Sequence, residues 1–64
     1  MQKIIATLTG LRIQKGMGQS EIAQAVGVSI PTLCKWETAR KSPTLENLER
    51  WCNALGHTLK ISID

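Results

Sequence analysis

The fold is decided by residues 19–38, which read QSEIAQAVGVSIPTLCKWET. Apolar residues at helical spacing predict a helix over residues 19–26, and Gly27 supplies the left-handed conformation that commonly ends a helix. A single residue later, Ser29 is a good N-cap for a second helix over residues 30–38. The sequence therefore predicts two short helices joined by a very tight turn.

The flanking sequence predicts two more helices and a strand. Apolar residues recur at helical spacing over residues 2–15 and again over residues 44–55, where Thr44 is the expected cap. These residues are Ile4, Leu8 and Leu11 in the first helix, and Leu45, Leu48, Trp51, Cys52 and Leu55 in the second. Residues 58–63 alternate instead, with the period of a strand. The expected fold is mostly α: one domain over residues 1–64 with four helices and a short C-terminal β-strand.

The chain is small and basic, with 64 residues and a formal net charge of +3. Domains of this size gain stability from disulfides, a metal or a partner subunit. Cys34, Cys52 and His57 are too few and too far apart for a zinc site, so we expect no metal and no cofactor. No secretory signal precedes the cysteines, so we expect a cytoplasmic protein with reduced thiols. A second copy of the chain is the expected supplement to the core.

The helix over residues 30–38 has two different faces. At about 100° per residue, Leu33 and Glu37 point one way, and Ile30 and Trp36 flank them. Its outward side carries, on the same wheel, Pro31, Lys35 and Thr38, with Thr32 at the edge. Two short helices joined in this way form the unit that inserts its second helix into the major groove of DNA. We therefore expect this side to face double-stranded DNA.

Several features occur together in residues 2–56, in a fixed order and spacing: Gln19, Ala23, Gly27, the Ser29–Thr32 opening, Trp36-Glu37, Ser42-Pro43 and Ala54-Leu55-Gly56. With these features, residues 2–56 resemble the Cro/C1-type helix-turn-helix family of phage repressors. The strand at the C-terminus resembles the variant found in HipB-like antitoxin repressors. The family implies that Gln19 contacts a phosphate and braces the second helix of the motif. It also implies that a pair formed by Arg12 and Glu37 joins the first helix to the third.

The family further implies which residues of this chain touch DNA. Bases would be contacted from the start and outward side of the third helix, and phosphates from the loop that follows it. The expected contact residues are Gln19, Ser29, Ile30, Pro31, Thr32, Lys35, Trp36, Thr38, Arg40 and Lys41. Four of these residues have a plainer interpretation. Lys35, Arg40 and Lys41 would be solvated surface charges, and Trp36 would be a packing residue, with or without a hydrogen bond from its indole N–H to a phosphate.

This sequence departs from the family pattern at two places. Gly18 stands where the family has a capping Ser or Thr, so the helix over residues 19–26 is expected to begin with a weak cap. Ile30 and Pro31 occupy positions that are often polar, and neither side chain can donate a hydrogen bond. Base recognition would then rely on Lys35, on Thr32 and on apolar contact with thymine methyl groups. Cys34 and Cys52 are expected to be small core residues, and His57 a turn residue.

The predicted strand needs a partner, because a lone strand leaves its backbone groups unpaired. Pairing with the same segment of a second subunit would bury Leu59, Ile61 and Ile63 and leave Lys60 and Ser62 in water. Pairing with residues near Met1 is the competing possibility. A dimer would hold two recognition helices about 34 Å apart and bind a palindromic operator.

The sequence therefore favours a dimeric repressor that binds double-stranded DNA. The alternative is an antitoxin that neutralises a protein toxin and regulates its own operon. An enzyme is not expected, because the sequence shows no carboxylate pair, activated nucleophile or phosphate-binding loop. No apolar run is long enough to cross a membrane, so we expect no membrane partner.

Overall fold

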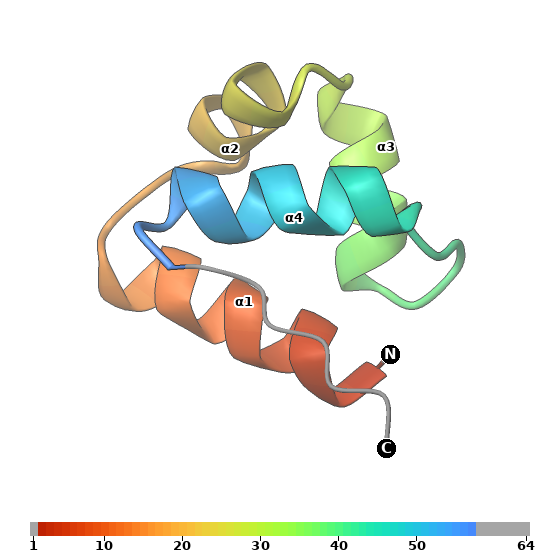
Figure 1. Ribbon diagram of the computed structural model, residues 1–64, viewed down its shortest axis with the longest axis horizontal. Helices are drawn as coiled ribbons and strands as arrows, with labels where there is room; N and C mark the ends of the chain where they lie inside the picture. Colours follow the sequence, from red (N-terminus) through yellow and green to blue (C-terminus); the bar gives the residue numbers. More distant parts are fainter. Residues whose placement is uncertain (1, 58–64) are drawn as a thin grey trace.

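The computed structural model describes residues 2–57 and forms four helices. These are α1 (Gln2–Gln14), α2 (Gln19–Val26), α3 (Ile30–Glu37) and α4 (Leu45–Ala54). In the view of Figure 1, α4 crosses the middle of the molecule, α1 lies below it, and α2 and α3 lie above and to the right. α2 packs against both α3 and α4, and α1 contacts α3. The predicted mostly-α fold with four helices is confirmed.

The observed helices are slightly shorter than the sequence predicted. Lys15 lies in the turn after α1, Thr38 and Leu55 are C-caps, and Thr44 is an N-cap. Capping residues flank a helix without taking full helical geometry, which explains differences of one residue. The predicted strand over residues 58–63 lies outside the described residues and stays a prediction.

The turn between α2 and α3 has the geometry that its sequence predicts. Gly27 lies in the left-handed region, at φ 90° and ψ 31°, and its N–H donates to the Ala23 carbonyl at 2.8 Å. The Ser29 hydroxyl oxygen accepts a hydrogen bond from the Thr32 N–H at 3.3 Å and so caps α3. Local chemistry alone therefore ends one helix and starts the next within three residues.

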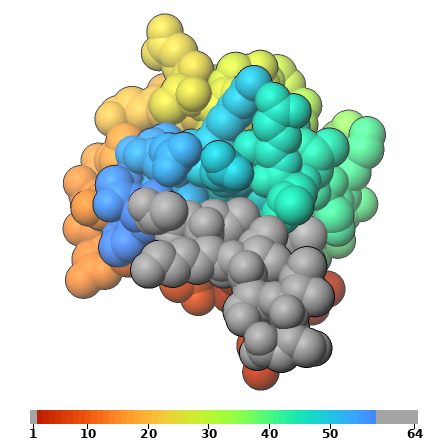
Figure 2. Space-filling view, in the orientation of Figure 1, coloured from red at the N-terminus to blue at the C-terminus, as the bar shows by residue number. Residues whose placement is uncertain are grey.

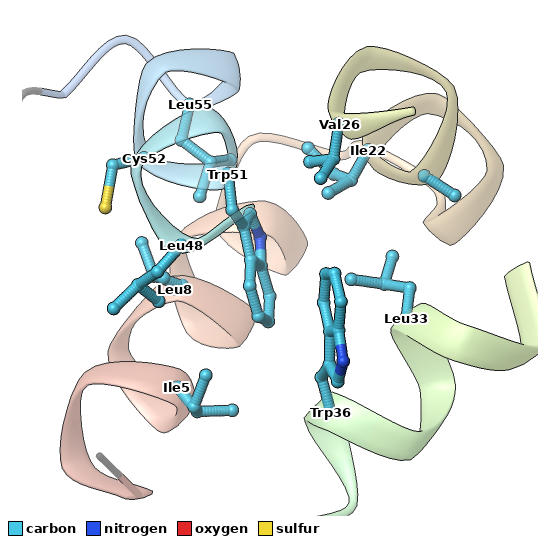
Figure 3. Packing of buried hydrophobic residues seen from close by; sticks show 11 residues of the cluster. Ile5, Leu8, Ile22, Val26, Leu33, Trp36, Leu48, Trp51, Cys52 and Leu55 are labelled. Carbon is cyan, nitrogen blue, oxygen red and sulfur yellow. The ribbon is translucent and has the colours of Figure 1, made fainter. Parts of the chain in front are cut away.

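The core lies where the four helices meet, around two tryptophans. The rings of Trp36 and Trp51 lie side by side with their centroids 6.0 Å apart and their planes 31° apart (Figure 3). This spacing is within the range of favourable aromatic pairs. The buried apolar residues around and including this pair are Ile5, Leu8, Ile22, Ala23, Val26, Leu33, Trp36, Leu48, Trp51, Cys52 and Leu55. Each helix contributes to this core, so the inner side of α3 is fixed to the rest of the molecule.

One expectation about the core was wrong, and the apolar pattern predicted for α1 was incomplete. Leu45 is 56% exposed, because it opens α4 and lies about 70° from the middle of the apolar stripe of that helix. Ile5 is buried, whereas Ile4 and Leu11 are only half-buried. At about 100° per residue, Ile4, Leu8 and Leu11 therefore lie toward one edge of the buried side of α1, which is centred between Ile5 and Leu8. In Figure 2, α4 lies in the middle of the visible face. The start of this helix lies beside the loop that follows α3.

Among the helices of residues 2–57, none combines the length and apolar character needed to cross a membrane.

Candidate nucleic-acid interface

One side of α3 and its C-cap faces solvent and forms a continuous surface, which we call the α3 outer face. Five exposed residues make up this face: Ile30, Pro31, Cys34, Lys35 and Thr38. At about 100° per residue they cover an arc of about 140° of the helix. On the opposite side, Leu33 and Trp36 are buried in the core. A helix fixed along one side and open along the other is suited to lie in a groove of another molecule.

The hydroxyl groups along α3 are engaged within the helix. The Thr38 hydroxyl donates to the Cys34 carbonyl at 2.8 Å. The Ser29 and Thr32 hydroxyl oxygens lie 2.8 Å apart and share one of their two protons. In this part of the chain, Lys35 therefore carries the one strong side-chain donor of the α3 outer face that no hydrogen bond occupies.

Positive charge gathers at the C-terminal end of α3. The backbone N–H groups of Arg40 and Lys41 both donate to the Lys35 carbonyl, at 2.9 and 3.2 Å. This return of the chain requires Ala39 to take a left-handed conformation, at φ 62°. The backbone thus holds three exposed cationic residues beside the last turn of α3. A cluster of this kind favours an anionic backbone such as that of DNA.

The C-terminal end of α3 is braced from inside by Glu37. Its carboxylate accepts hydrogen bonds from Arg12 Nε at 2.8 Å and Arg12 Nη2 at 3.1 Å. The same carboxylate accepts a third bond, from Gln19 Nε2 at 2.8 Å. Arg12 Nη1 also donates to the Met17 carbonyl at 2.9 Å, which ties the turn between α1 and α2 into the same network. One carboxylate therefore fixes three helices relative to one another.

Comparison with known families gives a match for residues 10–60 to the model of the helix-turn-helix family of the Cro/C1 type. The match spans most of the chain and includes the α2–α3 unit described above. The chain belongs to this helix-turn-helix family. No curated protein gives a significant match. Family membership makes the chain a DNA-binding regulatory domain, and it favours a regulatory over a catalytic role. The HipB-like variant that the sequence suggested is not confirmed.

Within this helix-turn-helix domain, Gln19 has the bracing contact that the family implied. Its amide bonds to Glu37 and so links the start of α2 to the end of α3. The expected weak cap beside it is also observed, because Gly18 has no side chain to bond the first turn of α2. The Glu21 carboxylate offers partial compensation by accepting from the Gly18 N–H at 3.4 Å. Contact between Gln19 and a phosphate stays a prediction.

Trp36 lies in the core of the domain. It is 4% exposed and packs against Trp51, which supports the interpretation as a packing residue. Most other residues expected to touch DNA lie on the α3 outer face, at its N-cap or in the loop after it, whereas Thr32 and Gln19 are half-buried, Gln19 at the start of α2. Their contacts with DNA stay predictions. The residues expected at a dimer interface, Leu59, Ile61 and Ile63, lie outside the described part of the chain.

The helix wheel misplaced two residues of the α3 outer face. It put Ile30 beside the inward residues Leu33 and Glu37, but Ile30 is 46% exposed. Cys34 was expected in the core, but it is exposed, between Ile30 and Thr38 on the helix wheel. The same expectation was right for Cys52, which is buried against the core. The position of Cys34 one turn after Ile30 could have indicated this, since residues at i and i+4 share a face. The thiol adds a small, weakly polar group to the α3 outer face.

The helix-turn-helix domain also has a hollow between the start of α1 and the end of α3. Its volume is about 150 Å³, and its lining includes Ile5, Trp36, Lys41 and Ser42. Pockets for drug-sized ligands measure roughly 300–1,000 Å³. This hollow lies on another side of α3 from the outer face, so its lining shares few of the residues expected to contact DNA.

Proposed function

We propose that the chain is a sequence-specific repressor that binds a palindromic operator as a dimer. The single observation that carries the proposal is the α3 outer face, which is open to solvent on a helix whose inner side is fixed. Its lysine and the loop cations Arg40 and Lys41 suit a surface of alternating base edges and phosphates. Lys35 would bind a guanine edge or a phosphate, and the loop would follow the backbone.

The dimer that we propose would use residues 58–63. A domain of this size buries only a modest core, and the strand predicted over these residues would need a partner. Sedimentation equilibrium on the full chain tests this, with the Ile61→Lys variant as comparison. We expect a dimer that the variant weakens by at least tenfold. A monomer at concentrations where the chain binds its operator would exclude the dimeric part of the proposal.

The proposal as a whole is tested by selection from a random duplex-DNA library at near-physiological salt. We expect a palindrome with half-sites about one helical turn apart, bound on the order of 10³-fold or more tightly than scrambled DNA. Repression then requires that the chain, bound at such a site overlapping a promoter, lowers transcription in a purified system. No enrichment from the library would contradict the proposal and direct attention to a protein partner, as for an antitoxin.

A further inference from the structure

The α3 outer face is unusually poor in groups that can recognise the hydrogen-bond pattern of a base pair. Three of its five side chains, those of Ile30, Pro31 and Cys34, offer carbon or a weakly polar sulfur. The Ile30 side chain is large and apolar, and the residue is 46% exposed in the first turn of the helix. An isoleucine at the start of a helix that approaches DNA gains most where it meets an apolar group. Against a polar base edge it would remove a donor or acceptor from water without bonding it.

The neighbouring hydroxyl groups do little to change this character. The Ser29–Thr32 pair uses one of its two hydroxyl protons in the bond between them at 2.8 Å and keeps one to donate, and the Thr38 proton is held by the Cys34 carbonyl. A hydroxyl that is already bonded within the helix gains less from a base than one that is free. Polar recognition from this face therefore depends mainly on Lys35, toward the C-terminal part of the helix.

Among the base-pair edges exposed in the major groove of B-DNA, the one apolar group is the C5-methyl of thymine. A methyl on C5 of cytosine occupies the same place in the groove, because the two pyrimidines share that ring position. The base edges otherwise present hydrogen-bond donors and acceptors. The apolar start of α3 thus matches a single chemical feature of the groove.

We propose that Ile30 and Pro31 form a contact site for C5-methyl groups of pyrimidines in each half-site, and that 5-methylcytosine is accepted there in place of thymine. This inference rests on the proposed function and names the chemistry that the same site recognises. At these positions the chain distinguishes base pairs by burying a methyl group. Lys35 distinguishes base pairs at another position by hydrogen bonds. Methylation of cytosine at an operator would then strengthen binding.

The test uses the intact chain and the duplex selected from the random library. Each thymine of a half-site is replaced in turn by uracil, which removes the methyl and leaves the hydrogen-bonding groups unchanged. We expect one or two positions at which affinity falls about fourfold, the effect of one buried methyl. At these positions, a pair with 5-methylcytosine is expected to bind about fourfold more tightly than the same pair with cytosine. Equal affinity for thymine and uracil at every position would overturn the proposal.

Two variants assign the methyl contact to α3. The double variant Ile30→Ala/Pro31→Ala keeps the Ser29 cap and is expected to bind thymine and uracil duplexes equally at the sensitive positions. Ile13→Ala is the matched control, since Ile13 is also exposed, at 64%, but lies at the end of α1. It should keep the full discrimination. Discrimination that survives in the double variant would also overturn the proposal, whereas a library that enriches nothing would contradict the proposed function itself.

Discussion

The Arg12 guanidinium and the Glu37 carboxylate form a two-point contact that links α1 to the C-terminal end of α3. Their side chains are only 12% and 6% exposed, so both charges are largely removed from water. Gln19 supplies a further donor to the same carboxylate. The position of the recognition helix therefore depends on a charged pair whose members compensate each other. This pair was implied by the family resemblance, and the structure confirms the contact.

Removing Arg12 should destabilise the domain strongly. In Arg12→Ala, the Glu37 carboxylate keeps only its bond from Gln19, and an uncompensated buried charge costs about 3 kcal/mol. Urea denaturation measures the change in the free energy of unfolding. The control is Arg50→Ala, which breaks the exposed pair with Glu46 at 2.7 Å and should cost at most about 0.5 kcal/mol. Similar losses in both variants would contradict the role assigned to burial.

Ala39→Gly should stabilise the domain by about 1 kcal/mol. Ala39 takes a left-handed conformation, at φ 62°, which a residue with a Cβ adopts at a cost and glycine adopts freely. The matched control is Ala6→Gly, an exposed position inside α1, where glycine should cost up to about 1 kcal/mol. Thermal unfolding of both variants gives opposite shifts if the backbone conformation is the cause. A fall in stability for Ala39→Gly would show that the loop gains more from restriction of the unfolded chain than it loses to strain.

Lys35 and Arg40 should affect DNA binding in different ways. Lys35→Ala is expected to relax specificity at one base pair of each half-site, by about 1–3 kcal/mol of discrimination. Arg40→Ala is expected to weaken binding to all sequences alike and to lower the salt dependence of the binding constant by about one unit. Lys15→Ala removes the same charge from an exposed residue after α1 and serves as the control. If all three variants behave alike, net charge and not position determines binding.

The two cysteines should differ sharply in reactivity. Cys34 is exposed, whereas burial raises the pKa of the Cys52 thiol and disfavours the reactive thiolate. A disulfide reagent should therefore modify one thiol per native chain quickly, and Cys34→Ser should remove that fast reaction. Two fast thiols in the native wild-type chain would show that Cys52 is accessible.

The raised pKa of Cys52 also predicts the sign of a pH effect. The folded state holds the thiol proton more tightly than the unfolded state, so this group favours folding below its unfolded pKa. That contribution is lost as the pH rises through the folded pKa. Unfolding free energies measured across alkaline pH should fall less steeply in Cys52→Ala than in the wild-type chain. An identical fall in both chains would assign the alkaline loss to other groups.

The local turn chemistry was the most predictable part of the fold. Gly27 and Ser29 act on their own backbone neighbours, so their effects are visible in the sequence before any packing is known. Leu45 and Cys34 were misassigned, and the buried Ile5 was not predicted, because burial depends on where one helix meets another. A helical wheel of about 100° per residue gives the direction in which a side chain points. It does not give the position along the helix axis at which a neighbouring helix makes contact.

The candidate interface was predictable to a similar extent. The outward direction of Pro31 and Lys35 followed from periodicity, and the Glu37 brace followed from family resemblance. The family resemblance also implied that Gln19 braces α3, but the bond itself, to Glu37 across 18 residues, depends on the distance between α2 and α3. No pattern within a single helix contains that distance. The engaged hydroxyl of Thr38 is likewise a matter of rotamer, which the residue type alone does not specify.

The packing of Trp36 against Trp51 has a consequence for the thermodynamics of association. Because an aromatic ring of α3 is clamped to α4, this helix cannot rotate or shift without opening the core. Its conformational entropy is therefore lost during folding, and association with DNA loses little more from this element. The heat-capacity change of binding should accordingly reflect the contact surface and any bending of the DNA, with no contribution from refolding of the protein. A helix only eight residues long can in this way act as a rigid template.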